Sequence, residues 1–288
     1  MSHSTIKTAI FPVAGLGTRF LPVTKSIPKE LLPVVDIPLI QLAVEEAAEA
    51  GCERFIFVTG RGKGAIEDHF DHAVELERSL EAHGKRDELN QLSKLIRTPG
   101  SVQYIRQQEP AGLGHAVWCA RHVVGDEPVA VILPDDVIKA PQGCLKQMID
   151  RYEGGNMIAV MEVEEEAVSR YGIVTPGQQE GPLVDVLGLV EKPPLAEAPS
   201  RLAVIGRYII EPEVFKVLRH TARGRQGELQ LTDSLAQRIG SAPFKGYRFE
   251  GERFDCGSKL GHLQANISFA LDRPALSDSL RAWLRSVL

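Results

Sequence analysis

The sequence predicts an α/β protein with a doubly wound, mostly parallel sheet, because strand-like and helix-like patterns alternate along its first half. Aliphatic runs that are typical of strands buried on both faces occur at residues 8–13, 55–59, 102–107 and 129–134. Amphipathic stretches that are typical of helices lie between these runs, at residues 39–50, 65–83 and 114–124. Since crossover connections join parallel strands, the helices are expected to cover both faces of the sheet.

The pattern changes after about residue 155, where short Gly and Pro segments separate further strand-like runs at residues 157–163, 172–175, 184–190 and 202–210. Here we expect a mixed sheet. Helical patterns return at residues 212–219, 229–239, 259–271 and 276–288. No repeat or linker divides the chain, so we expect one unit over residues 1–288. Its second half, from about residue 156, should cap the carboxyl ends of the strands, where open α/β sheets bind ligands.

Charge and composition exclude several classes of protein. The chain has 288 residues, with 33 Lys and Arg against 38 Asp and Glu, and this acidic balance disfavours nucleic acid as a partner. No apolar run approaches the roughly 18 residues of a membrane span, and the N-terminus lacks a signal-peptide pattern. The 4 cysteines contain no C-x-x-C pair, which argues against a zinc site or a disulfide framework. We expect a cytoplasmic protein with no membrane partner.

The glycine-rich segment Ala14-Gly15-Leu16-Gly17-Thr18-Arg19 follows the first predicted strand. Such a loop exposes backbone N–H groups, and Lys25 and Lys29 supply cations nearby, so the region suggests a nucleotide site. The dinucleotide fingerprint fails because Phe20 stands at the third glycine position, and the chain contains no P-loop motif. The alternative is a tight turn with solvated basic residues.

The segment from Phe11 to Gln41 closely resembles the bacterial UTP:glucose-1-phosphate uridylyltransferases, a branch of the sugar-nucleotidyltransferase superfamily. The resemblance continues at Gln107 and at residues 112–117, 128–136, 171–172, 191–193, 206–208, 228–233 and 255–257. It implies the Rossmann-like nucleotidyltransferase fold, with a nucleotide-binding half (about 1–155) and a smaller sugar-binding and C-terminal helical half (about 156–288). The family forms UDP-glucose, a precursor for polysaccharide synthesis and other carbohydrate metabolism, with release of pyrophosphate.

The implied reaction is a direct attack of the sugar phosphate on the α-phosphorus of UTP. Because the nucleophile is already an anion, the enzyme must position two polyanions and stabilise charge rather than activate a hydroxyl. His115 and Cys119 are accordingly interpreted as packing residues rather than as a nucleophilic pair.

The resemblance assigns the triphosphate and metal groups. Arg19 and Lys29 match the family's signature cations, and Lys25 is a plausible helper. Asp135 matches the principal Mg²⁺ ligand, and Asp255 matches a second superfamily carboxylate. For each carboxylate the alternative is a solvated acid near a strand end.

The resemblance also assigns the contacts to the base. Uracil selection is expected from the side chain of Gln107, since an amide can match the donor and acceptor edge of a pyrimidine. The nucleotide site is completed by backbone groups of the glycine-rich loops and by the acid Glu30. The loop residues are Ala14, Gly15, Gly17 and Gly112. The alternative for Gln107 is a surface amide at a strand end.

Glucose 1-phosphate is assigned to the second half of the chain. Glu191 accepts from sugar hydroxyls and Lys192 binds the sugar phosphate, whereas taken alone the two would be a solvated ion pair. Asp136 is expected to bind another hydroxyl, while Gly172 and Gly206 bring backbone close to the hexose.

The alternatives to uridylyl transfer are a dTTP-specific enzyme and a non-catalytic regulatory paralogue. A dTTP-specific enzyme is disfavoured because thymidylyl relatives usually carry consecutive glycines where this chain has Val13-Ala14-Gly15-Leu16-Gly17. A non-catalytic regulatory paralogue should have lost signature residues, yet the chain retains Thr18, Arg19, Lys29, Asp135 and Lys192.

Assembly is suggested by family precedent, which is a homodimer or homotetramer. An apolar stripe in the last predicted helix consists of Leu276, Leu280, Trp283, Leu284 and Leu288. It can form either a subunit contact or an intramolecular packing face.

Overall fold

The first half of the chain forms the parallel part of the sheet, as predicted. The structure is a computed structural model that describes residues 6–224 and 227–287, so Leu288 of the predicted apolar stripe lies outside the described residues. Four strands lie in the order β5-β4-β1-β6, with all neighbours parallel: β1 (Thr8–Pro12), β4 (Arg54–Thr59), β5 (Val102–Arg106) and β6 (Val129–Ile132). The carboxyl ends of these strands therefore share one edge of the sheet.

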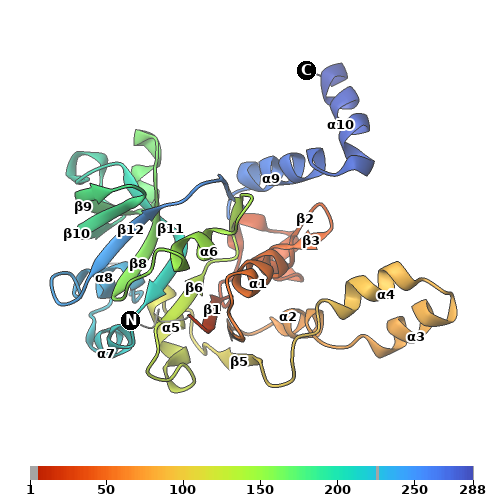
Figure 1. Cartoon of the computed structure of the whole chain (residues 1–288), viewed down its shortest axis with the longest axis horizontal. Helices are drawn as coiled ribbons and strands as arrows, with labels where there is room; N and C mark the ends of the chain where they lie inside the picture. Colours follow the sequence, from red (N-terminus) through yellow and green to blue (C-terminus); the bar gives the residue numbers. More distant parts are fainter. Residues whose placement is uncertain (1–5, 225–226, 288) are drawn as a thin grey trace.

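The second half extends the same sheet with mixed polarity. The order continues as β11-β8-β12-β10-β9, which gives nine strands within the described ranges (Figure 1). The added strands are β8 (Asn156–Glu162), β9 (Gly172–Glu180), β10 (Leu183–Glu191), β11 (Leu202–Ile210) and β12 (Phe244–Arg248). Only β8 and β12 pair in parallel there, so the mostly parallel character is confined to the first half.

Helices bury both faces of the sheet, which explains why its strands are apolar throughout. Alternate residues of β1 belong to different clusters: Phe11 packs with one set of helices and Ile10 with the other. The first set includes α1 (Leu39–Glu49), α2 (Gly64–His69) and α6 (Cys144–Ile149), and the second includes α5 (Leu113–Cys119), α7 (Glu213–His220) and α8 (Leu231–Ala236). The predicted doubly wound arrangement is confirmed.

The remaining elements lie at the periphery of the molecule. The helix predicted over 65–83 is wrong as a single element, because the chain bends after α2 where the Phe70 ring packs 5.2 Å from the Phe57 ring. The rest of it is α3 (Val74–Ala82), which with α4 (Arg86–Ser93) projects away from the sheet in Figure 1. The C-terminal helices are α9 (Lys259–Leu271) and α10 (Pro274–Val287).

Short strands and single-turn helices complete the fold. The strands are β2 (Pro33–Val34) with β3 (Ile37–Pro38), and β7 (Asp136–Lys139) with β13 (Glu252–Asp255). The 3₁₀ helices are η1 (Thr18–Phe20), η2 (Val23–Lys25), η3 (Lys29–Leu31), η4 (Ala120–His122), η5 (Glu165–Arg170) and η6 (Leu195–Glu197). Within the described ranges, no helix is both long enough and apolar enough to cross a membrane.

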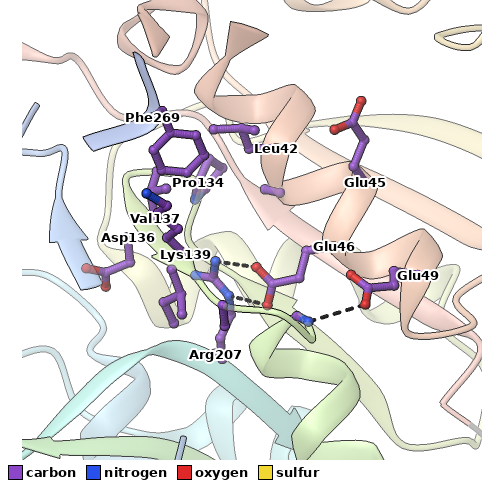
Figure 2. Close-up of a pocket in the computed structure, with 14 residues that line it drawn as sticks. Leu42, Glu45, Glu46, Glu49, Pro134, Asp136, Val137, Lys139, Arg207 and Phe269 are labelled. Atoms are coloured by element: carbon purple, nitrogen blue, oxygen red, sulfur yellow. Dashed lines mark hydrogen bonds and ion pairs between the residues drawn. The ribbon is translucent and has the colours of Figure 1, made fainter. Parts of the chain in front are cut away.

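A buried ion pair joins β11 to α1. The Arg207 side chain is 2% exposed, and its Nη2 and Nε donate to Glu46 Oε2 and Oε1 at 2.6 and 2.9 Å (Figure 2). Glu46 Oε1 also accepts from the backbone N–H of Leu145 at the start of α6, and Arg207 Nη1 donates to the carbonyl of Leu133 beyond β6. The pair forms part of the wall of a cavity of about 410 Å³ and links three elements to the end of β6.

Glu46→Ala removes the carboxylate but leaves the Arg207 guanidinium buried, so we expect the free energy of unfolding to fall by about 3–5 kcal/mol. Urea unfolding measures this change. The matched control is Glu45→Ala on the same helix, where the side chain is exposed and a change within about 0.5 kcal/mol is expected. Equal losses in the two variants would contradict the stabilising role of the ion pair.

Candidate active site

A cavity of about 510 Å³ opens where β1 and β6 end and brings together residues that are far apart in the sequence. Seven of the predicted site residues line it: Ala14, Gly15, Gly17, Lys29, Gln107, Gly112 and Asp135. Its other lining residues include Thr18, Leu113, Leu133 and Glu228. Because β1 and β6 are parallel neighbours, the loop after one and the acid after the other necessarily face the same space.

Gly17 gives the loop after β1 its shape. Its φ of 67° is a left-handed conformation, and a methyl group on it would lie 3.1 Å from Lys29 Cβ and 3.3 Å from Thr24 Cγ2. The Gly17 carbonyl accepts a hydrogen bond from Thr24 Oγ1 at 2.7 Å. A glycine is therefore required for the loop to lie against the segment that carries Lys29.

Lys29 and Asp135 form an ion pair in this cavity, with Nζ 2.5 Å from Oδ2. Burial by itself raises the pKa of Asp135, but the charge and hydrogen bond of Lys29 outweigh it and hold that pKa below its usual value. Because the folded-state pKa is depressed, the stability contributed by Asp135 is present above the unfolded pKa and is lost as the pH falls through the folded one. The site is thus built to keep this carboxylate ionised.

Asp255 and Arg19 reach Asp135 around Gly257. A methyl group on Gly257 would lie 3.1 Å from both Asp135 Oδ2 and Asp255 Oδ1, and 3.3 Å from Arg19 Nη1. Arg19 Nη1 also donates to the Gly257 carbonyl at 3.3 Å. The other oxygen of Asp255 accepts from Arg170 Nη2 at 2.8 Å, a partner that sequence reasoning missed. Two carboxylates and a guanidinium therefore converge on one point.

A second group of predicted residues meets where β9 and β10 pair. Gly172 lies opposite Glu191 in the sheet, and a methyl group on Gly172 would lie 3.2 Å from Glu191 Oε2 and 3.1 Å from Thr232 Cγ2. Thr232 belongs to the segment 228–233 that shares the family resemblance, and the resemblance assigns it no role. Lys192 Nζ lies 3.1 Å from Glu191 Oε1, and its side chain is 53% exposed. Lys192 has a φ of 46°, which is a strained conformation for a residue other than glycine.

Asp136 and Gly206 contact each other beyond the end of β6. Asp136 Oδ1 accepts from Arg253 Nε at 2.7 Å, and Oδ2 accepts from the backbone N–H of Gly206 at 3.0 Å. A methyl group on Gly206 would lie 2.7 Å from Asp136 Oδ2. The predicted sugar contacts of these two residues stay predictions; in this structure Asp136 bonds to Gly206 and to Arg253.

Glu30 and Lys25 lie outside the set that lines the cavity. Glu30 is 1% exposed, and its Oε2 accepts from Lys63 Nζ at 2.7 Å. Burial raises the pKa of Glu30, while Lys63 and Lys29 oppose that shift. The predicted nucleotide contact of Glu30 stays a prediction; in this structure its carboxylate lies beside these lysines. Lys25 is exposed on η2.

Gln107 is held beside the loop that precedes α5. Its Nε2 lies 3.2 Å from the Gly112 carbonyl and 2.9 Å from His115 Nδ1. Gly112 has a φ of 98°, and a methyl group there would lie 2.7 Å from the Leu229 carbonyl. The segment containing Leu229 therefore packs directly on this loop, which explains why Glu228, a residue with no predicted role, lines the cavity.

Comparison with known proteins adds independent findings. The family model described as nucleotidyl transferase matches residues 8–268. The chain is 48% identical over 285 residues to UTP–glucose-1-phosphate uridylyltransferase of Bacillus subtilis, covering 98% of this chain and 97% of that protein. It is 47% identical to the protein of that name from Komagataeibacter xylinus, covering 97% of this chain and 96% of that one.

Solved structures agree with the sequence comparison. A UTP-bound UDP-glucose pyrophosphorylase from Acinetobacter baumannii superposes with a TM-score of 0.90 at 43% identity, covering 98% of this chain and 100% of that one. A UDP-glucose pyrophosphorylase complexed with UDP-glucose gives a TM-score of 0.83 at 42% identity, covering 93% of this chain and 100% of that one.

Lys29→Met should raise the pKa of Asp135 above its ordinary value, because burial persists while the neighbouring cation is gone. An NMR titration of the Asp135 carboxyl carbon, without divalent cation, measures it. Lys25→Met is the matched control, since Lys25 is exposed and forms no ion pair with Asp135 among the described residues. A pKa that stays depressed in Lys29→Met would show that other groups keep the carboxylate ionised.

Proposed function

This chain belongs to the nucleotidyl transferase family and transfers uridylyl from UTP to glucose 1-phosphate, and we propose that it does so by direct in-line attack of the sugar phosphate on the α-phosphorus. The observation that carries the proposal is the convergence of Arg19, Lys29, Asp135 and Asp255 at the end of β6. Such a group matches a reaction in which charge must be neutralised and no nucleophile needs activation.

The first half of the chain, to about residue 155, would bind the nucleotide. The backbone at Ala14, Gly15 and Gly17 follows β1 at the cavity, where successive N–H groups suit an anion. Lys29 would leave its ion pair with Asp135 and pair with the triphosphate instead, and Arg19 would donate two hydrogen bonds to the phosphate oxygens. Gln107 and Gly112 stand at the same cavity and would meet the uracil.

We propose Mg²⁺ as the divalent metal that this family typically uses. The donor set fits, because Asp135 Oδ2 and Asp255 Oδ1 each lie 3.1 Å from the position that a methyl group on Gly257 would take, and both are the hard oxygen ligands that Mg²⁺ prefers. The described residues contain no group of three or more His, Cys, Asp and Glu side chains suited to a metal, so phosphate oxygens and water would complete the shell. When bound, the ion would neutralise charge on the phosphates.

The second half, from about residue 156, would bind glucose 1-phosphate. Glu191 would accept from sugar hydroxyls, with Gly172 and Thr232 beside it, and Lys192 would turn from Glu191 to the sugar phosphate. The left-handed backbone of Lys192 supports this role, because strain of about 1–3 kcal/mol at a non-glycine residue tends to persist at binding sites.

We further propose that the chain assembles as a homodimer or homotetramer through α9 and α10. Large apolar side chains are exposed along both helices: Leu260, Leu263, Ile267, Leu276, Trp283 and Val287. Several exposed apolar side chains on neighbouring helices suit a subunit interface. Light scattering measures the mass in solution, and a monomer would contradict this assignment. The cytoplasmic location stays a prediction from the sequence.

Asp135→Asn should lower kcat at least about 10²-fold at saturating Mg²⁺, because it removes the negative charge that holds the metal between the phosphates. Pyrophosphate release from UTP and glucose 1-phosphate measures the rate. One parallel reaction replaces UTP with dTTP, and another omits the sugar phosphate. The matched control is Asp126→Asn, at an exposed position before β6, which should keep the parental rate. Near-parental turnover in Asp135→Asn would remove Asp135 from the proposed metal site.

Lys192→Ala should weaken glucose 1-phosphate binding by about 10-fold or more, since a hydrogen bond to a charged group contributes about 1.5–3 kcal/mol. UTP affinity should change much less. Calorimetry with each ligand measures both, and Lys216→Ala, which removes an exposed lysine paired with Glu213 on α7, is the control. Equal losses for the two ligands would place Lys192 outside the sugar-phosphate site.

A further inference from the structure

The side-chain amide of Gln107 has a defined orientation. A carbonyl oxygen can only accept, so the amide atom 3.2 Å from the Gly112 carbonyl must be the donor Nε2. The same Nε2 lies 2.9 Å from His115 Nδ1. Its two hydrogens therefore go to Gly112 and His115, which requires His115 Nδ1 to be an unprotonated acceptor.

This arrangement leaves the amide oxygen for a ligand. No donor among the described residues reaches Gln107 Oε1, and Gln107 lines the cavity assigned to the nucleotide. The residue therefore offers the cavity an acceptor and no donor. The sequence predicted that Gln107 would offer the base both a donor and an acceptor, whereas here the side chain offers only the acceptor.

The surroundings of His115 keep its ring neutral. Burial lowers the pKa of His115, as does the charge of Arg223, while Glu109 opposes and Arg121 adds a smaller lowering. Cys119 Sγ lies 4.0 Å from Nδ1 on the next turn of α5, and burial raises the pKa of that thiol, so it brings no charge. The ring of Trp118 lies 5.9 Å from the imidazole. An imidazole in this setting accepts at Nδ1 near neutral pH.

We propose that His115 is a positioning residue for base selection: by accepting from Gln107 Nε2 together with the Gly112 carbonyl, it helps to fix Oε1 toward the base. Uracil carries a hydrogen on N3 that Oε1 can accept, whereas cytosine carries a lone pair on N3 that Oε1 repels. The inference rests on the proposed function, since it takes Gln107 to face the pyrimidine.

Loss or protonation of the imidazole acceptor has a specific consequence. A protonated His115 would donate from Nδ1, which favours the reversed amide with Oε1 toward His115 and Nε2 toward the base, against the repulsion that Oε1 would then meet from the Gly112 carbonyl. The reversed amide donates to N3 of cytosine. Weakened positioning should therefore raise the use of CTP rather than lower all activity.

The experiment is competition between UTP and CTP at saturating glucose 1-phosphate and Mg²⁺, reported as the ratio of kcat/KM for the two nucleotides. In His115→Phe, which keeps a ring but loses the acceptor, the ratio should fall about 2- to 12-fold, the range expected for one hydrogen bond. The change should appear as faster use of CTP, with UTP within about twofold of the parent. His115→Asn supplies an acceptor near the position of Nδ1 and should restore the ratio. Cys119→Ala, on the same helix, is the control and should leave it unchanged.

Two further measurements separate positioning from structural damage. In the Gln107→Ala background, His115→Phe should cause no further change in the ratio, because its effect passes through Gln107. Between about pH 8 and about pH 5, the parental ratio should fall as His115 becomes protonated, while His115→Phe and His115→Asn lack this fall. Protonation of cytosine itself is common to all the proteins and cancels in the comparison.

The outcomes distinguish the inference from the proposed function. If the parent releases no pyrophosphate from UTP and glucose 1-phosphate, the proposed function fails and the inference fails with it. If the parent is active but the ratio is unchanged in His115→Phe, or falls equally in the Gln107→Ala background, the inference alone is overturned. If His115→Phe does not fold, the pH dependence of the ratio is compared between the parent and His115→Asn. The same pH dependence in both proteins would overturn the inference.

Discussion

The ion pair between Lys29 and Asp135 is the interaction on which the site depends. Asp135 follows a fully buried strand and lies where burial opposes ionisation, so without a neighbouring cation it would be a poor ligand for a metal ion. Lys29 supplies that cation from a loop that lies against Gly17. The charge balance is completed inside the protein before any ligand arrives, because burying either charge without the other would be costly.

A second layer of buried charge fixes where Asp135 stands. The adjacent Asp136 is held by Arg253 of β13 and by the backbone N–H of Gly206, and Arg207 joins β11 to Glu46 of α1. Because Asp135 and Asp136 are consecutive, holding one restricts the direction of the other. Asp136 is therefore bonded to the surrounding protein, whereas Asp135 faces the cavity. An acid with spare hydrogen-bonding capacity suits a ligand, whereas a saturated one suits a support.

The two halves of the chain contribute different kinds of backbone to the site. The parallel half ends its strands at one edge, so loops after β1 and β6 meet without long connections. The antiparallel half brings Gly172 opposite Glu191 by strand pairing, and the segment that includes Leu229 and Thr232 links both regions by packing on Gly112 and Gly172. Such a division fits two anionic substrates, because the triphosphate would meet the cations of the first half and the sugar phosphate would meet Lys192 of the second.

The sequence by itself determined the alternating parallel core, the glycine-rich loop and the charged residues after β1 and β6, since local periodicity and motif order carry that information. It did not reveal β12 or β13, whose short polar-rich segments become strands only through pairing with β8 and β7. Nor did it separate Asp135 from Asp136, or show that Glu30 is buried and that His115 Nδ1 lies within hydrogen-bond distance of the Gln107 amide. Those distinctions depend on which atoms are already bonded, and hydrogen-bond partners such as Arg253 and Asp136 stand far apart in the chain and meet only when the tertiary structure forms.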